Sequence, residues 1–83
     1  MMPAYIYILS CRGGGLYTGW TVDVPRRVEQ HQAGKGGRYT RSHLPVELVY
    51  QEEYPTQGEA MRRECEIKKM TRAQKLTLIK QSI

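Results

Sequence analysis

Four polar side chains recur at regular intervals in the first half of the chain. Tyr7 and Tyr17 are ten positions apart. Arg27 follows after ten more, and His31 lies four residues beyond it. Phenols and imidazoles transfer protons and a guanidinium holds phosphate oxygens, so this set could bind and hydrolyse a phosphodiester. The alternative is that both tyrosines only fill half-buried strand positions, as tyrosine often does.

The two tyrosines need a β-hairpin to meet. Residues 5–9 are continuously apolar, with β-branched and aromatic content, and residues 16–20 resume this pattern after three consecutive glycines. Such a sequence predicts two strands and a tight loop. If the numbers of paired residues sum to an even value, as an odd-length loop requires, Tyr7 and Tyr17 project from the same face. A bulge near the glycines would change this phase.

Arg27 and His31 are expected on the first helix. Asp23, followed by a proline in the first turn, predicts that this helix begins at about residue 24, and Gly34 predicts its end near residue 33. Residues four apart share one flank of a helix, here at the border of its apolar stripe. Both side chains are therefore expected to reach toward the sheet.

The second half of the chain predicts one strand and two helices. Residues 46–51 have strong β content, and capping boxes at residues 56–59 and 71–74 open helices, the first of which is expected to continue to about residue 70. The core-facing stripe of the last helix is predicted to be Ala73, Leu76, Ile79 and Ile83. The 83 residues therefore predict a single domain, residues 1–83, with the element order strand, strand, helix, strand, helix, helix.

A carboxylate falls on the inward face of the helix expected over residues 57–70. Glu64 shares that face with Ala60, Ile67 and Thr71 by the i, i+4, i+7 rule. A carboxylate in such a row is costly unless a cation or a metal ion is its partner. Arg27, in a purely structural ion pair, and a divalent ion are the two candidate partners.

These residues suggest a division of chemical roles. Tyr7 would be the base for the attacking water if a neighbouring cation or metal-bound water lowers its pKa. Arg27 would bind the scissile phosphate, and Glu64 would hold Mg²⁺, which accepts few protein ligands. Tyr17 and His31 would orient water or phosphate, or share the proton transfer. A two-metal site is not expected, because it needs several clustered carboxylates.

The charge of the chain favours a polyanionic partner. Thirteen Lys and Arg against eight Asp and Glu give a formal net charge of +5. Cations are concentrated in the unpatterned, glycine-rich stretch of residues 34–43, at Lys35, Arg38 and Arg41. Tyr39 offers a stacking face in the same stretch, so these four residues are candidates for binding a nucleic-acid backbone. The alternative is a mobile surface loop.

Two further features bear on the cellular compartment. Cys11 and Cys65 are far apart and lack metal-ligand spacing, so both are expected to be reduced thiols. No segment reaches the length of a membrane-spanning helix, and the first residues lack the pattern of a signal peptide. A cytoplasmic protein is therefore expected.

Taken together, the chain resembles the GIY-YIG nuclease superfamily. The first motif stands at residues 5–7 (Tyr-Ile-Tyr) and the second at residues 17–19 (Tyr-Thr-Gly). Arg27 and His31 match the helix signature R-x-x-x-H, and Glu64 matches the single metal-binding glutamate. The first motif departs from the pattern in having tyrosine for glycine, and the second has threonine for isoleucine. An asparagine that many members carry near the end is absent, which puts in doubt how substrate or Arg27 is held.

The stretches at residues 34–41 and 45–50 further resemble the small stand-alone bacterial subfamily of YhbQ-like proteins. The resemblance implies an α+β fold in which a three-stranded antiparallel sheet is flanked by three helices. It also implies a DNA endonuclease that uses one Mg²⁺ or Mn²⁺ ion. Trp20, just after the second motif, is either a core residue or a base-stacking platform.

Other classes of function remain open at this point. One alternative is a non-catalytic nucleic-acid-binding module that keeps the fold, and another is a protein-interaction domain with a buried pair of Arg27 and Glu64. DNA, or alternatively RNA, is expected to be bound through its backbone. The protein is expected to be a monomer, and an unidentified protein partner is compatible with the sequence.

Overall fold

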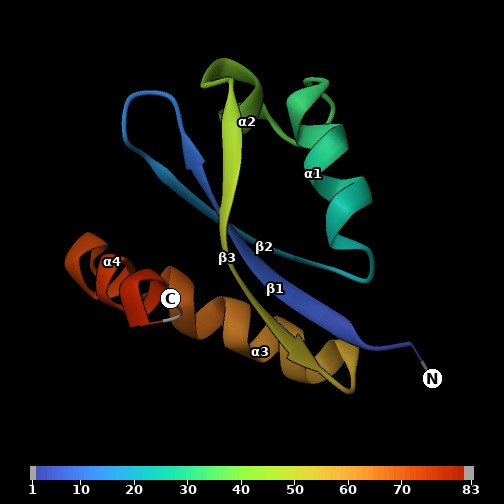
Figure 1. Ribbon diagram of the computed structural model, residues 1–83. Helices are drawn as coiled ribbons and strands as arrows, with labels where there is room; N and C mark the ends of the chain where they lie inside the picture. The colour runs from blue at the N-terminus through green and yellow to red at the C-terminus, as the bar shows by residue number, and fades with distance from the viewer. Residues whose placement is uncertain (1, 82–83) are drawn as a thin grey trace.

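The computed structural model describes residues 2–81, which fold into one three-stranded sheet with helices on both of its faces (Figure 1). In chain order the elements are β1 (Ala4–Cys11), β2 (Leu16–Thr21), α1 (Val24–Gln32), α2 (Arg38–Ser42), β3 (Val46–Tyr54), α3 (Gln57–Lys68) and α4 (Arg72–Gln81). This confirms the predicted α+β order, to which the structure adds the short helix α2. The third strand is three residues longer than predicted.

The pairing of β1 with β2 has the predicted phase. The strand order is β2-β1-β3, and both neighbours of β1 run antiparallel to it. Tyr7 lies opposite Gly19, and Leu9 lies opposite Tyr17, so the numbers of each pair sum to an even value. The bulge lies on the other side of β1, between Ile8 and Leu9 where they meet β3. Tyr7 and Tyr17 therefore project from one face, as predicted.

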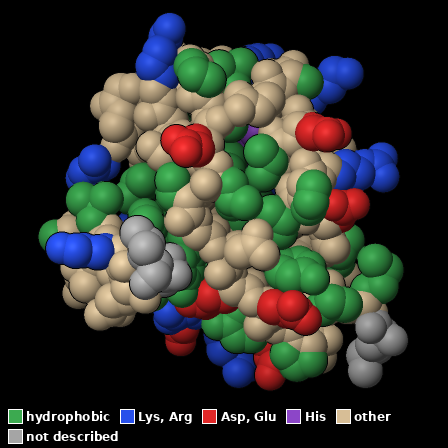
Figure 2. Space-filling view, in the orientation of Figure 1, with side chains coloured by type: hydrophobic (Ala, Val, Ile, Leu, Met, Phe, Trp, Pro, Cys, Tyr) green, Lys and Arg blue, Asp and Glu red, His purple; other side chains and the backbone are tan. Residues whose placement is uncertain are grey.

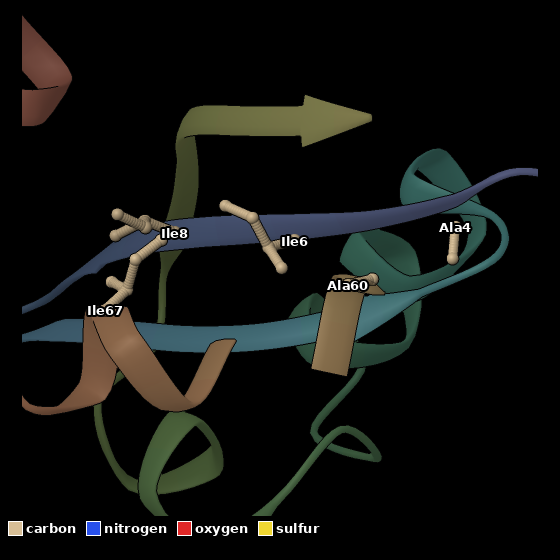
Figure 3. Packing of buried hydrophobic residues seen from close by; sticks show 5 residues of the cluster. All are labelled: Ala4, Ile6, Ile8, Ala60 and Ile67. Atoms are coloured by element: carbon tan, nitrogen blue, oxygen red, sulfur yellow. The ribbon is translucent and has the colours of Figure 1, made fainter. Parts of the chain in front are cut away.

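One face of the sheet packs against α3. Its cluster consists of Ala4, Ile6 and Ile8 of β1 with Ala60 and Ile67 of α3, and all five side chains are fully buried. Figure 3 shows Ile67 beside Ile8, with Ala60 further along the strand toward Ala4. This layer supplies the main apolar contact that fixes α3 beneath the sheet.

The opposite face carries the tyrosines and packs against α1. Its buried cluster combines Tyr7, Leu9 and Cys11 of β1 with Val46 of β3. Tyr17 and residues of the α1 side are packed against it. Figure 1 shows α1 on this side of the sheet and α3 and α4 on the other. A phenol thus lies within this largely apolar cluster.

The first helix begins where the sequence predicts. The Asp23 carboxylate accepts a hydrogen bond from the backbone N–H of Arg26 at 3.2 Å, and a proline occupies the first turn. The helix ends at Gln32, and Gly34 follows with a φ of 79°, a conformation that glycine adopts without strain. The start and the glycine stop are both confirmed.

The stretch of residues 34–43 is not the unpatterned loop that the sequence suggested. Residues Arg38–Ser42 form the five-residue helix α2, which buries Thr40 completely. A single turn of this length has too few residues for a helical hydrophobic period, so the sequence pattern could not reveal it. The segment is therefore anchored on its inner side.

Both later capping boxes are confirmed. The backbone N–H of Glu59 donates to Thr56, and at α4 the pair Thr71 and Gln74 exchange hydrogen bonds at 3.2 and 2.9 Å. Because α3 ends at Lys68, Thr71 caps the next helix and is exposed instead of facing inward.

The predicted core stripe of α4 is mostly wrong. Ala73 and Leu76 are exposed, whereas Leu78 and Ile79 pack against the α3 cluster. Of the predicted stripe, Ile79 alone among the described residues packs inward, and its neighbour Leu78 takes the place of Leu76 in the contact. The fourth predicted position, Ile83, lies outside the described residues.

Two findings concern the expected compartment. Cys11 is a buried free thiol and Cys65 an exposed one. Across residues 2–81, the longest helix has 12 residues, and none is long and apolar enough to cross a membrane.

Candidate active site

Tyr7 and His31 form a buried hydrogen bond at the centre of the α1-facing layer. The Tyr7 hydroxyl lies 2.9 Å from Nε2 of His31, and the two side chains are 1% and 0% exposed. His31 reaches this position from the last turn of α1, which lies across the face from which Tyr7 projects. The structure therefore joins two of the predicted residues through a direct, buried contact.

Tyr17 completes a cluster of three rings. Its ring centroid lies 6.4 Å from that of Tyr7 and 5.1 Å from that of His31. The contact with His31 is edge-on, at 62°, a favourable arrangement for aromatic rings. Tyr17 is only half-buried, in contrast to Tyr7 and His31. It is therefore the phenol of the pair that solvent can reach.

Arg27 is held on the α1 side of this cluster. Its Nη1 donates to Oε1 of Gln30 at 3.0 Å, and its Nη2 donates to the carbonyl of Gly36 at 2.9 Å. Arg27 and Gln30 also line a pocket of about 380 Å³ that extends to Met2 and Arg26. The guanidinium is therefore fixed in direction but remains reachable from solvent.

A larger pocket does not belong to the cluster. It measures about 480 Å³ and lies between the sheet and the start of α1, with Val24, Val28 and Leu48 in its wall. None of the predicted site residues lines it. Figure 2 shows hydrophobic side chains across the middle of the face viewed, with Lys and Arg toward its margins.

The electrostatic surroundings keep both partners of the buried hydrogen bond neutral. Burial raises the pKa of Tyr7, while the neighbouring Arg27 guanidinium opposes this shift and the Tyr17 and Glu64 groups add to it. Burial, and then the charge of Arg27, lower the pKa of His31. The expected lowering of the Tyr7 pKa is therefore not produced by the protein groups. A Tyr7 phenolate needs a nearby proton acceptor, which His31 can be.

Glu64 lies on the flank of α3 that faces β2. Positions 63 and 64 lie on opposite sides of the inward row of Ala60 and Ile67. Arg63 donates to Glu52 of β3 at 2.9 Å, which places the flank of Arg63 toward β3. Since β2 and β3 lie on opposite sides of β1, Glu64 is directed toward β2, the strand of Tyr17.

Glu64 is half-buried and not fully buried as its row predicted. Its side chain is 18% exposed, and its Oε2 lies 3.6 Å from Nζ of Lys68. In the part of the chain that the structure describes, the remaining ion pairs join Arg63 to Glu52 and to Glu66. The structural pair of Arg27 and Glu64 is therefore not formed there.

The available donors fit one hard divalent ion at Glu64. The ion pair with Lys68, whose side chain is 55% exposed, is a weak surface pair, so a divalent cation could displace Lys68 from Glu64. No group of three or more His, Cys, Asp or Glu side chains that could share a metal occurs within residues 2–81. Mg²⁺ and similar ions bind through one carboxylate and keep most of their waters. Glu64 thus offers a single oxygen ligand of the kind that Mg²⁺ and Mn²⁺ bind.

Two glycines allow the rings to approach the backbone closely. A Cβ atom at Gly19 would lie 2.6 Å from the Tyr7 hydroxyl, and one at Gly36 would lie 2.1 Å from Nδ1 of His31. Both distances are shorter than real Cβ contacts allow. Glycine is therefore required at both positions by the close approach of a ring, a requirement that sequence analysis did not foresee.

The predicted nucleic-acid-binding residues lie on the surface beside the cluster. Lys35, Arg38 and Arg41 are exposed, and none of them belongs to an ion pair of the described chain. Tyr39 is 41% exposed and stacks on His43 with ring centroids 4.3 Å apart. The segment therefore presents cations and an aromatic stack to solvent.

Three other polar groups bear on the site or the core. Trp20 packs against the α3-facing cluster, which makes it a core residue. Thr18, on the same face of the sheet, is 4% exposed and its hydroxyl has no partner among the described residues. Thr40 contacts His31 and was missed, because its burial depends on α2. A threonine within a basic segment gave no signal of this.

The comparisons with known proteins agree with this fold. A family model described as the GIY-YIG catalytic domain matches residues 3–77. A UPF0213 protein of Streptococcus sanguinis is 55% identical over 78 residues, which cover 94% of this chain and 90% of the relative. A UPF0213 protein of Staphylococcus aureus is 53% identical over 77 residues, covering 93% and 94%.

Two solution NMR structures are also similar. The UPF0213 protein from Bacillus halodurans has a TM-score of 0.62 at 46% identity, over 95% of this chain and 84% of that one. A protein from E. faecalis has a TM-score of 0.65 at 36% identity, over 98% and 86%. The chain belongs to the GIY-YIG family, and its small UPF0213 relatives confirm the resemblance to the small stand-alone subfamily. Membership supports an activity of the nuclease class, while the names of these relatives specify no activity.

Proposed function

We propose that this protein is a metal-dependent endonuclease that hydrolyses DNA phosphodiester bonds. The observation that carries the proposal is the buried contact between the Tyr7 hydroxyl and Nε2 of His31, with the Tyr17 ring beside both. Arg27, Tyr17 and Glu64 all act on the pKa of Tyr7. A hydroxyl in contact with a proton acceptor and beside a second phenol is an arrangement that general acid–base catalysis can use.

The proton path follows from the buried hydrogen bond. Tyr7 removes a proton from the attacking water as its own phenolic proton moves to Nε2 of His31. The oxygen of that water forms a bond to phosphorus, and the bond from phosphorus to the leaving oxygen breaks. The leaving oxygen takes a proton from bulk solvent, and His31 then releases a proton to bulk solvent through Tyr7, which restores the neutral pair. Tyr17, half-exposed beside both rings, positions the incoming water or phosphate.

Arg27 and Glu64 supply the charges that the reaction needs. The Arg27 guanidinium holds non-bridging oxygens of the scissile phosphate, where negative charge grows in the transition state. Glu64 holds the divalent ion. When bound, Mg²⁺ or Mn²⁺ would polarise the phosphate and stabilise the leaving oxygen.

The exposed cations beside the cluster suit contacts to a nucleic-acid backbone. Lys35, Arg38 and Arg41 would pair with phosphates, and Tyr39 would offer a stacking face. We infer DNA as the substrate, with RNA as the competing polymer, and a monomer acting in the cytoplasm. Binding should weaken steeply with salt, because each phosphate contact releases counterions.

The first test is cleavage of single-stranded, duplex and branched DNA, and of RNA, with Mg²⁺ or Mn²⁺ against EDTA. Glu64→Ala should abolish cutting, and Glu47→Gln, which removes an exposed carboxylate from β3, should leave it unchanged. Equal cutting by wild type and Glu64→Ala would overturn the metal assignment. Binding of DNA without cleavage under every metal would favour a non-catalytic nucleic-acid-binding module.

The second test assigns the base. Tyr7→Phe should lower kcat by about 100-fold or more, a typical contribution of general-base catalysis, and leave the affinity for DNA near wild type. Tyr17→Phe should have the smaller effect on kcat and the larger effect on KM. The reverse order would transfer the role of base to Tyr17.

A further inference from the structure

We propose that Thr40, on the buried face of α2, is a positioning residue that fixes the tautomer of His31. Thr40 would hold the proton on Nδ1, so that Nε2 is free to accept the proton of Tyr7. The catalytic consequence rests on the proposed function. The tautomer itself is a property of the folded chain and can be measured without any reaction.

The contacts of Thr40 require one direction of hydrogen bonding. Its Oγ1 lies 2.8 Å from Nδ1 of His31 and donates to the carbonyl of Gly37 at 3.3 Å. A hydroxyl has a single proton to donate and two lone pairs that accept. With the Thr40 proton donated to the Gly37 carbonyl, the Thr40 oxygen accepts a hydrogen bond from Nδ1–H of His31.

The contact with Tyr7 is consistent with the same tautomer. A hydroxyl buried this completely needs an acceptor for its proton, since leaving it without one is costly. Arg27, which also acts on Tyr7, can only donate. Nε2 of His31 lies within reach and can accept this proton when Nδ1 carries the proton of the ring. Both ends of the hydrogen-bonded series from Tyr7 to Gly37 are thus compatible with the same tautomer of His31.

The surroundings of His31 leave this choice to Thr40. Tyr7 approaches from β1, Tyr17 from β2 at 5.1 Å between ring centroids, and Arg27 from the preceding turn of α1. The segment before α2 closes the remaining side, where Gly36 lies against the ring. The described contacts of His31 include no carboxylate that could select a tautomer, as often happens for catalytic histidines.

Helix α2 therefore has two functional faces. Its inner face carries Thr40, and its outer face presents Arg38, Tyr39 and Arg41 to solvent. The helix that would contact the substrate backbone is the same one that would orient the proton acceptor. The sequence pattern predicts only the role of the outer face.

The direct test is ¹⁵N NMR of histidine-labelled protein, in which the two ring nitrogens of a neutral imidazole have distinct shifts. In the wild type, His31 should show the Nδ1–H tautomer, and His43, on the surface, provides an internal comparison. Thr40→Val should shift His31 toward Nε2–H, Thr40→Ser should keep Nδ1–H, and Ser42→Ala should change nothing. Ser42 is a matched control, because its hydroxyl also donates to a carbonyl of α2 but is exposed.

The functional test separates this inference from the proposed activity. Thr40→Val should lower kcat by about 10- to 100-fold, the usual effect of removing a residue that orients a catalytic group, with KM for DNA nearly unchanged. Thr40→Ser should restore most of the loss. An Nε2–H tautomer in the wild type, or equal kcat in Thr40→Val, would overturn the proposal. If Thr40→Val does not fold, the wild-type tautomer and Thr40→Ser decide the question. A wild type that never cleaves would refute the activity and leave the tautomer result standing.

Discussion

The Tyr7 hydroxyl and Nε2 of His31 are 2.9 Å apart in a layer from which solvent is excluded, although they come from a strand and a helix 24 residues apart in the chain. The two groups have opposite pKa shifts, upward for the phenol and downward for the imidazole, and burial is the largest cause of both. Proton transfer between them therefore does not occur at rest. Transfer of the Tyr7 proton to His31 becomes favourable when Tyr7 takes a proton from water at the same time.

The lowered pKa of His31 predicts its titration. The His31 ring should remain neutral down to a pH below 6.5, which is the ordinary pKa of histidine. Arg27→Gln should raise the His31 pKa by removing the second cause of the shift. NMR titration of the His31 ring measures both. Arg26→Gln, which removes an exposed neighbouring charge, should leave the His31 pKa nearer wild type. An identical His31 pKa in the two variants would show that Arg27 does not act on the ring.

The contact between Lys68 and Glu64 predicts competition with the metal ion. Lys68→Gln removes a cation 3.6 Å from the Glu64 carboxylate, so the affinity for Mn²⁺ should rise about two- to fivefold, as expected for a largely exposed pair. Calorimetric titration with Mn²⁺ measures the change. Lys69→Gln, on the neighbouring exposed position, is the control. Weaker binding in Lys68→Gln would mean that Glu64 does not hold the ion.

The Thr18 hydroxyl predicts a stabilising substitution. A buried hydroxyl without a partner costs about 1–3 kcal/mol, and Thr18→Val replaces it with a methyl group of similar size. The free energy of unfolding in urea should therefore increase. Thr18→Ser, which keeps the hydroxyl and loses the methyl group, should decrease it. A lower stability of Thr18→Val would mean that the Thr18 hydroxyl is hydrogen-bonded in the folded protein.

The cluster around Glu52 predicts acid lability. Burial alone would raise the Glu52 pKa, but hydrogen bonds from Arg63, Tyr50 and Tyr54 together outweigh it and hold the pKa below its ordinary value. The folded state therefore gains stability above the unfolded pKa and loses it as the pH falls through the folded one.

Glu52→Gln should cost about 2 kcal/mol of unfolding free energy at neutral pH, less than a fully buried pair because both partners are partly exposed. It should also flatten the dependence of stability on pH in the acid range. Urea titrations from neutral to acid pH measure both effects. Glu53→Gln, exposed on the same strand, should change neither, and equal losses in the two variants would refute the role of the cluster.

Local signals explain what the sequence could predict. The hairpin phase depends on the loop length beside Tyr7 and Tyr17, and the helix starts depend on capping side chains such as Asp23 and Thr71. These interactions span a few residues, so they can be recognised in a single amino-acid sequence. The inward-facing row of α3 likewise predicted the approximate position of Glu64.

Tertiary packing explains what the sequence could not predict. Thr40 becomes a partner of His31 only because a single turn of helix folds back against α1. The packed row of α4 is chosen by contact with the α3 cluster and not by its own periodicity, which is why Leu76 is exposed. The pKa of Tyr7 rises because burial outweighs the neighbouring guanidinium, a balance that depends on depth in the fold.

The close approach at Gly19 and Gly36 has a consequence for protein engineering. A Cβ atom at either position would occupy the space of the Tyr7 hydroxyl or of the His31 ring. A designer who transplants this cluster to another scaffold must therefore copy two positions that bear no side chain along with those that bear functional groups. Libraries that vary only the polar residues, on a backbone with alanine at these points, should yield no variant with the two rings in contact.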